Sequence, residues 1–304
     1  MEDLEKLAGP LILAPLMFVV GLQLTVADFR RVLAQPRSVL GGTLGQLILL
    51  PLMTLAVIHL FTVSPWLAAG ALLVSATPGA GMSNIMAAVS GANVALSVTL
   101  TALTSVLSIL TIPLSLALAS ALFLGDTLNV DVPLRGITLQ LLLFLAVPIS
   151  LGMYVRARHP ETAIRYVSRA NRFALIAIVV LTVLGALTSD IEIPQGVDVG
   201  WAVATAAVWT LCAMAIGYGL ASALHLPNND RFTYLIEFGA RNMALAVVVA
   251  VTSVEGVELV LFPLIYGIVG TPLVLLLAIV RGRRQREKHQ IDYPSQESKE
   301  SQNN

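Results

Sequence analysis

The sequence predicts an all-α membrane protein that crosses the bilayer with about nine helices. Three observations lead to this fold class. Hydrophobic residues make up 57% of the chain, only 12% of the residues are charged, and the mean hydropathy is +0.84. Soluble domains usually carry about 25% charged residues, so a soluble globular fold is excluded. Apolar runs of about 20 residues, the length that a helix needs to cross a bilayer, recur along the chain.

Nine of these runs are predicted to form spans. Residues 1–280 are therefore expected to form a single membrane transporter domain, followed by a basic and polar tail, residues 281–304, that is predicted to be disordered. In chain order the predicted spans are Leu7–Ala27, Ser38–Phe61, Pro65–Ser90, Val94–Phe123, Val132–Val155, Phe173–Ser189, Val199–Leu224, Asp230–Thr252 and Val257–Val280.

The positive charges predict how these spans are oriented. Of the 18 Lys and Arg residues, 15 fall in loops or the tail on one side, Lys6 and Arg135 fall on the other side, and Arg241 lies inside a span. Cytoplasmic loops carry the excess of positive charge, so we expect the N-terminus outside and the C-terminus in the cytoplasm. Residues Met1–Lys6 lack the cationic start of a secretory signal, so the first span is expected to be retained.

The eighth span contains an unusual polar segment, Glu237-Phe-Gly-Ala-Arg-Asn242. Between Phe232 and Val251 the charged residues are Glu237 and Arg241, and they stand one helical turn apart. Charges inside a membrane are rare and usually functional. Because side chains four residues apart on a helix can meet, a purely structural ion pair is the alternative interpretation.

The third span is interrupted by the segment Ser75-Ala-Thr-Pro-Gly-Ala-Gly-Met-Ser-Asn84. Pro78 removes a backbone donor and disfavours helical geometry at the preceding residue, and the two glycines allow the chain to turn. The order of small residue, polar residue and Asn is the same in Gly81–Asn84 and in Gly239–Asn242. Matching interruptions in the two halves of a chain indicate the binding site of a transporter.

Little in the sequence supports an enzyme. Cys212 is the one cysteine, and the histidines show neither metal-ligand spacing nor an acidic or nucleophilic partner; they are His59, His159, His225 and His289. No phosphate-binding loop or nucleophile motif is present. We therefore expect binding and translocation instead of catalysis.

Polar side chains of neighbouring spans are expected to gather at the interruptions. The short loop Gly91–Asn93 brings the fourth span back beside the third, so Ser97 and Thr101 can face Ser83 and Asn84. Bonding to their own backbone is the alternative role for such hydroxyls, as helix–helix contact is for the amide of Gln46. Oxygen-rich clusters and the carbonyl ends of broken helices attract cations, whereas the restarted helices attract anions. The pattern predicts a cation-coupled carrier of an organic anion.

These segments resemble the bile acid:sodium symporter family, in particular its bacterial nine-helix members. The resemblance rests on Ser75–Asn84, Gly91–Thr99, Glu237–Asn242 and Gly21–Thr25, and it extends from Gly9 to Val280. It implies an inverted repeat of five plus five helices without the first, divided into core and panel domains. It also implies that the two discontinuous helices cross at the midplane, and that the protein lies in the bacterial inner membrane.

The resemblance further implies two sodium sites. The first maps to Ser83, Asn84, Ser97, Thr101 and Glu237. The second maps to Gln46, Glu237, Phe238, Ala240 and Arg241. Substrate contacts are expected from Arg241, Asn242, Asn84 and Tyr266.

Two positions depart from the family pattern. Arg241 stands where the family usually has Gln, and Tyr266-Gly267 stands where bile-acid carriers show His-Asn. The guanidinium of Arg241 stays protonated, so it either replaces the second sodium as a built-in charge or reaches the carboxylate of the substrate. We therefore expect one sodium ion instead of two, and a substrate that is bile-acid-like or a smaller carboxylate such as a 2-oxo acid or pantothenate.

The function expected from the sequence is sodium-coupled import of an organic anion by alternating access, through rocking of core against panel. The expected partners are sodium, a small organic anion and the lipid bilayer, with no nucleic acid. A proton-coupled carrier using Glu237, an uncoupled carrier or channel, and a membrane sensor are the alternatives.

Overall fold

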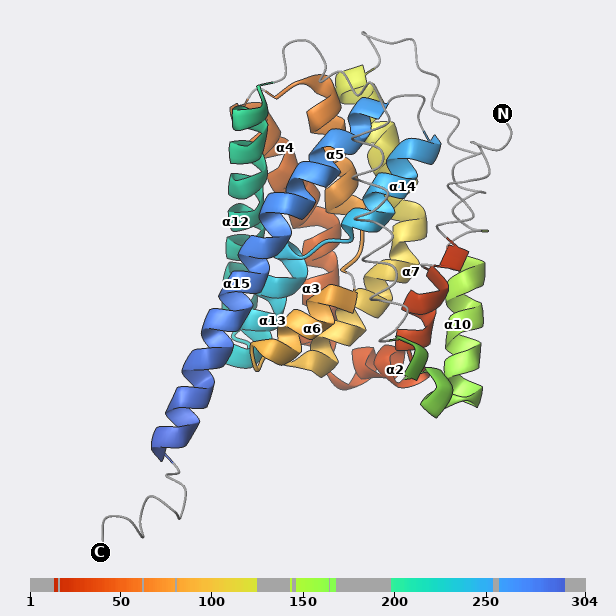
Figure 1. Cartoon of the computed structure of the whole chain (residues 1–304), viewed down its shortest axis with the longest axis vertical. Coiled ribbons are helices and arrows are strands. Elements are labelled where there is room, and N and C mark those ends of the chain that lie inside the picture. The colour runs from red at the N-terminus through yellow and green to blue at the C-terminus, as the bar shows by residue number, and fades with distance from the viewer. Residues whose placement is uncertain are drawn as a thin grey trace, which may run out of the picture.

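The computed structural model describes residues 14–15, 17–61, 63–79, 81–124, 143, 146–163, 165–167, 198–253 and 257–292. Within these ranges every named element is helical, and the one extended pairing is a single bridge between Gly79 and Arg241. Figure 1 shows a bundle of long helices, with the C-terminal part of the last helix extending beyond one end of the bundle.

Four helical stretches in the described part of the chain are long and apolar enough to cross a membrane. Each agrees with a predicted span to within a few residues at its start. They are Pro36–Phe61 (α3, Pro36–Leu44; the π-helical turn η1, Gly45–Leu49; α4, Leu50–Phe61), Val94–Phe123 (α7, Val94–Ala119, running into the turn η2, Ser120–Leu124), Val199–Ala223 (α12) and Leu261–Glu287 (part of α15, Leu261–Asp292). These lengths and compositions are those of an all-α, multi-pass membrane protein.

Two further spans are interrupted where the sequence predicts it. The third consists of α5 (Pro65–Ala76) and α6 (Gly81–Val89), and the eighth consists of α13 (Asn228–Gly239) and α14 (Met243–Ser253). The α5 helix begins with a proline at its first position, which suits the fixed φ of that residue, and it ends just before Pro78. The residues that follow α5 and α13 are extended: Thr77 has φ −71° and ψ 150°, and Ala240 has φ −100° and ψ 92°.

The two broken helices lie against each other. The α5 segment packs beside α14, and α6 packs beside α13, as Figure 1 shows in the middle of the bundle. The backbone N–H of Asn242 donates to the carbonyl of Pro78 at 3.0 Å. The interruptions therefore meet, and the four half-helices point their ends at one place.

The first and fifth predicted spans are described only in part. A helical segment through Gln23 is followed by a separate helix, α2 (Val26–Ala34), and α10 (Val147–Arg158) represents the fifth span. Figure 1 places α2 and α10 together at one side of the bundle, near α7. The sixth predicted span, Phe173–Ser189, lies outside the described residues. The count of nine spans, the inverted repeat and the core and panel division stay predictions.

Arg30 and Arg31 fall in the loop that the predicted spans leave between Ala27 and Ser38, but in the structure they belong to α2. The hydroxyl of Thr25 donates to Asp28 Oδ2 at 2.7 Å, and the Thr25 N–H donates to the same oxygen at 2.8 Å, which caps the helix. Arg31 Nη1 donates to the carbonyl of Ala95 at 2.8 Å. The helix is therefore fixed at its start and attached to α7.

The predicted disorder of the tail is wrong for its first part. The α15 helix continues past Val280 to Asp292. Arg281 Nη2 donates to Asn229 Oδ1 at 2.7 Å, and its guanidinium lies 4.2 Å from the ring centre of Phe232. Arg, Lys, Gln and Glu are good helix formers, and these contacts to α13 extend the helix where hydropathy alone predicts its end.

Candidate functional site

The carboxylate of Glu237 is the centre of a buried oxygen cluster at the helix crossing. Glu237 lies in the last turns of α13 and is 0% exposed. Its Oε1 accepts from Ser97 Oγ at 2.5 Å, and its Oε2 accepts from Thr101 Oγ1 at 3.0 Å. The hydroxyls of Ser83 and Thr101 lie 3.4 Å apart. The structure therefore brings together four of the residues predicted for the first sodium site.

Asn84, the fifth predicted member, joins this cluster through Ser97. Ser97 Oγ lies 2.8 Å from Asn84 Oδ1 as well as 2.5 Å from Glu237. A serine hydroxyl has one proton, so it can donate to only one of these two acceptors at a time. Acceptor oxygens thus converge without a matching number of protons, which is the chemistry of a site for a hard cation.

Gly79 allows the backbone of the first interruption to approach this carboxylate. A Cβ atom at position 79 would lie 2.6 Å from Glu237 Oε2 and 2.8 Å from Thr101 Oγ1. Any larger residue would displace both oxygens, so the glycine is required by a close approach.

Arg241 bonds a different set of groups. It is 5% exposed, and its Nη1 donates to Gln46 Oε1 and to the carbonyl of Glu237, the latter at 3.2 Å. Its Nη2 donates to the carbonyls of Ser75, at 3.2 Å, and Thr77. Three of these acceptors are backbone carbonyls at the C-terminal ends of α5 and α13. Helix C-termini carry partial negative charge, so the guanidinium occupies a carbonyl-lined cation site.

The interpretation of Glu237 and Arg241 as a mutually neutralising ion pair is wrong. In the part of the chain that the structure describes, the ion pair is Asp28 with Arg31, at 3.7 Å, and none joins Glu237 to Arg241. The carboxylate bonds hydroxyls, whereas the guanidinium bonds carbonyls and an amide. Each charge therefore has its own polar environment within one junction.

The carbonyl groups that accept hydrogen bonds from Arg241 were not predicted from the sequence. Gln46 lies in the π-helical turn η1, a distortion that is frequent at functional sites, and the carbonyls of Ser75 and Thr77 complete its surroundings. Phe238 and Ala240, predicted for the second sodium site, have other contacts: Phe238 stacks on Tyr234, and Ala240 N–H donates to the carbonyl of Ile236. The sequence signal that could have indicated the acceptors of Arg241 is Pro78, which ends the helix and leaves carbonyls before it without helical partners.

Asn242 and Tyr266, which are expected to contact the substrate, form hydrogen bonds within the protein in this structure. Asn242 Oδ1 accepts from the N–H of Leu245 at 3.0 Å, which caps α14. The Tyr266 hydroxyl accepts from Arg241 N–H at 2.6 Å and donates to the Gly239 carbonyl at 2.8 Å. Tyr266 thus bridges the interruption between α13 and α14.

Tyr266→Phe is expected to lower the stability of the protein by about 1–3 kcal/mol, because it leaves the buried N–H of Arg241 and the carbonyl of Gly239 without partners while preserving the ring. The melting temperature in detergent measures this loss. Tyr154→Phe, which removes a hydroxyl from an exposed tyrosine, is the matched control. Equal melting temperatures for Tyr266→Phe and wild type would contradict the bridging role.

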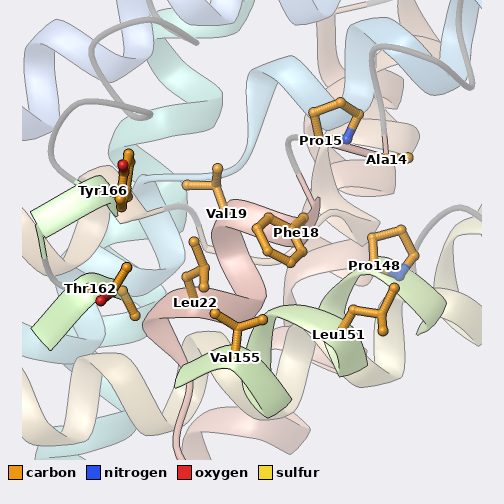
Figure 2. A pocket seen from close by; sticks show the side chains of 11 residues that line it. Ala14, Pro15, Phe18, Val19, Leu22, Pro148, Leu151, Val155, Thr162 and Tyr166 are labelled. Atoms are coloured by element: carbon orange, nitrogen blue, oxygen red, sulfur yellow. The ribbon is translucent and has the colours of Figure 1, made fainter. Parts of the chain in front are cut away.

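Two cavities have contrasting linings. The smaller, of about 280 Å³, lies against the crossing and is lined by Gln46 and Arg241 among others. The larger, of about 610 Å³, lies between residues 14–22, α10 and residues 162–166. Figure 2 shows Phe18 and Leu22 projecting from the first segment toward Leu151 and Val155 of α10. Its lining is almost entirely apolar, whereas the lining of the smaller cavity includes the guanidinium-bearing residue Arg241.

Comparison with known proteins identifies the family. The P3 protein of Bos taurus is 28% identical over 257 residues, which are 81% of this chain and 52% of that protein. The sodium/bile acid cotransporter 4 of Homo sapiens is 28% identical, covering 83% and 58%, and the probable sodium/metabolite cotransporter BASS2, chloroplastic, of Oryza sativa subsp. japonica is 30% identical, covering 77% and 54%. The chain thus spans little more than half the length of these relatives.

The family match covers more than half of the chain. Residues 10–193 match the sodium bile acid symporter family, and this range includes Gln46 and the four residues that surround the carboxylate of Glu237. The expected absence of an enzyme motif agrees with this assignment, because the family is one of transporters. The chain therefore belongs to the sodium bile acid symporter family.

Proposed function

We propose that the protein is a secondary active transporter that couples the import of an organic anion to sodium by alternating access. The observation that carries the proposal is the buried cluster around Glu237, where two broken helices and α7 contribute hydroxyl, amide and carboxylate oxygens. Broken helices that meet at a polar site are the arrangement from which sodium-coupled transporters bind their ions. The relatives named as sodium cotransporters support the same coupling ion.

We propose that one sodium ion binds per cycle, at Ser83, Asn84, Ser97, Thr101 and Glu237. Arg241 serves as a permanent cation in the second, carbonyl-lined position, because its guanidinium already bonds Gln46 and the ends of α5 and α13. A sodium ion in the same carbonyl cluster would meet a fixed positive charge at contact distance.

The remaining sequence expectations complete this proposal. Residues 1–280 form the transporter domain, with core and panel parts that move against each other. The protein lies in the bacterial inner membrane with its N-terminus outside and its C-terminus in the cytoplasm. The anion is a carboxylate, and Asn84, Arg241, Asn242 and Tyr266 contact it or fix the groups that do.

The first test is the melting temperature of the purified protein in detergent as sodium replaces potassium at constant total salt. Binding to the folded state raises stability by mass action, by about 2.7 kcal/mol at a hundredfold excess over the dissociation constant. We expect a saturable, sodium-specific rise. Equal melting temperatures in both salts, together with uptake into proteoliposomes that follows a pH gradient, would show that the coupling ion at Glu237 is a proton and not sodium.

Thr101→Val is expected to weaken sodium binding at least tenfold, about 1.4 kcal/mol, because it removes the hydroxyl at 3.0 Å from Glu237 and keeps the shape of the side chain. The sodium concentration that gives half of the maximal thermal shift measures the effect. Thr205→Val is the control, since Thr205 donates only to its own helix, at the Trp201 carbonyl. An unchanged sodium midpoint in Thr101→Val would remove Thr101 from the site.

A further inference from the structure

The extension of α15 beyond Val280 carries arginines on two different sides. The sequence Arg-Gly-Arg-Arg-Gln-Arg occupies positions 281–286. Arg281 and Gly282 are partly or fully buried against the protein, whereas Arg283, Arg284 and Arg286 are exposed. The helix therefore turns one basic side toward the bundle and another away from it.

The inner side fixes the rotation of this helix. Arg281 Nη2 donates to Asn229 Oδ1 at 2.7 Å, and its guanidinium lies over the ring of Phe232, both in α13. Gly282 packs so closely on the carbonyl oxygen of Val89, at the end of α6, that a Cβ atom there would collide with it. The first turn of the extension is thus held against α6 and α13 in one orientation.

The outer side continues an apolar stripe. Leu276 is 58% exposed and Val280 is 37% exposed. Residues four and seven positions apart share one side of a helix, so Arg283 and Arg284 follow Leu276 and Val280 on that side. An exposed apolar face on a membrane-spanning helix is the face that lipid acyl chains cover. The two arginines therefore stand where the lipid-facing stripe ends.

Their depth matches the headgroup layer. The contacts of Arg281 and Gly282 place these residues level with the start of α13 and the end of α6, and Figure 1 shows α15 leaving the bundle at this end. A helix rises about 1.5 Å per residue, so Arg283 and Arg284 lie within roughly 5 Å of that level. The headgroup layer on each side of a bilayer is about 5–7 Å thick. Long arginine side chains easily reach across it.

The charges on this outer side are not neutralised within the protein. Among the residues that the structure describes, the ion pair is Asp28 with Arg31, and neither a carboxylate nor a hydrogen-bond acceptor engages Arg283, Arg284 or Arg286. A guanidinium can bind a phosphate group through two parallel hydrogen bonds. Anionic phospholipids leave this phosphate charge uncompensated, whereas phosphatidylcholine carries an ammonium group beside it.

A role in membrane topology alone does not account for this arrangement. Orientation requires positive charge near the end of a span, which a disordered tail also supplies. It does not require an ordered helix that is fixed by Arg281 and Gly282 so that the following arginines continue the lipid-facing side.

We propose that Arg283 and Arg284, with Arg286 beside them, form a docking surface for the headgroups of anionic phospholipids in the adjacent leaflet. The inference goes beyond the proposed function and is independent of the coupling ion and the substrate. Because α15 contacts both α6 and α13 at this level, bound lipid stabilises the position of these half-helices.

The test measures the melting temperature of the purified full-length chain in mixed micelles, as phosphatidylglycerol or phosphatidylcholine is added at constant sodium concentration. Lipid that binds the folded protein raises this temperature by mass action. We expect a saturable rise with phosphatidylglycerol and a much smaller one with phosphatidylcholine. Raising the ionic strength with choline chloride from about 0.1 M to about 1 M shortens the Debye length from about 10 Å to about 3 Å, so it should weaken the response.

Charge variants localise the surface. Each arginine near an anionic membrane strengthens binding about fivefold, so Arg283→Gln with Arg284→Gln should raise the half-saturating fraction of phosphatidylglycerol about twenty-fivefold. The matched control is Arg283→Lys with Arg284→Lys, which keeps both charges and should stay within about threefold of wild type. Glu287→Gln removes an exposed negative charge one turn further on, so it should shift binding in the opposite direction. All these positions are exposed, and we expect the variants to fold.

Three results would overturn the proposal. An equal phosphatidylglycerol response in wild type and in the double glutamine variant would place the lipid elsewhere. Equal responses to phosphatidylglycerol and phosphatidylcholine would remove the headgroup selectivity. A response to soluble glycerol 3-phosphate as strong as that to the lipid would make this a site for free phosphate esters. The sodium-specific shift without added lipid reports separately on the cluster at Glu237, so failure of the lipid proposal leaves the proposed coupling intact.

Discussion

Glu237→Gln is expected to abolish sodium-dependent uptake and to weaken sodium binding at least a hundredfold, about 2.7 kcal/mol. Glutamine fits the same space but removes the only negative charge in the cluster of described residues. Its amide nitrogen would also place a donor against a hydroxyl that now donates to Glu237, so one contact becomes repulsive unless the hydroxyls reorient. Uptake into proteoliposomes under an inward sodium gradient measures the result.

The control for Glu237→Gln is the same change at an exposed position. Glu161 lies at the surface, and Glu161→Gln should leave both the sodium midpoint and uptake unchanged. Normal sodium-driven uptake by Glu237→Gln would show that the ion binds elsewhere. Sodium-independent but pH-driven uptake by the wild type, lost in Glu237→Gln, would instead make this residue a proton site.

Arg241→Gln is expected to create a second sodium site. It frees the carbonyls of Ser75, Thr77 and Glu237, and it places a second amide beside Gln46. These are oxygen ligands at two helix C-termini, which favour a cation. The dependence of thermal stabilisation on sodium should steepen, with a Hill coefficient that rises from about one toward two.

Arg283→Gln is the matched control for Arg241→Gln, because it removes the same charge from the exposed side of α15. A folded Arg241→Gln protein with an unchanged sodium slope would contradict the built-in cation.

Much of the architecture follows from the sequence because hydropathy and helix breakers act locally. Pro78 and the glycines beside it disfavour a continuous helix through their local backbone geometry, so the interruption between α5 and α6 is predictable. Hydropathy alone misses the α2 helix and the extension of α15, which combine local helix signals with contacts to other helices. Arg31 bonds α7 and Arg281 bonds α13 across long sequence separations, and neither contact leaves a mark in local composition.

Some contacts of the candidate site could likewise be predicted from the sequence, and others could not. The short loop and the residue spacing predict that Ser97 and Thr101 lie beside Ser83 and Asn84, and the family resemblance adds Glu237, which both hydroxyls contact. The resemblance placed Gln46 near Arg241, but the carbonyl partners of Arg241 were not predicted, since two of them are backbone groups at the turn that follows α5. A spacing of four residues had made an ion pair with Glu237 the alternative interpretation. The extended backbone at Ala240 breaks the helical register on which that interpretation depended.

The positive charge of Arg241 is part of the carrier, so it affects the energetics of transport differently from a bound sodium ion. Arg241 returns with the empty protein after each cycle, so it neither crosses the membrane as cargo nor draws energy from the sodium gradient. Under the proposed stoichiometry, when one sodium ion enters with a carboxylate that carries a single charge, no net charge moves. Membrane voltage, which contributes about 2.3 kcal/mol per charge at 100 mV, then gives no driving force. Accumulation of the acid is limited to the sodium concentration ratio, whereas a second mobile sodium would square that ratio and add the voltage.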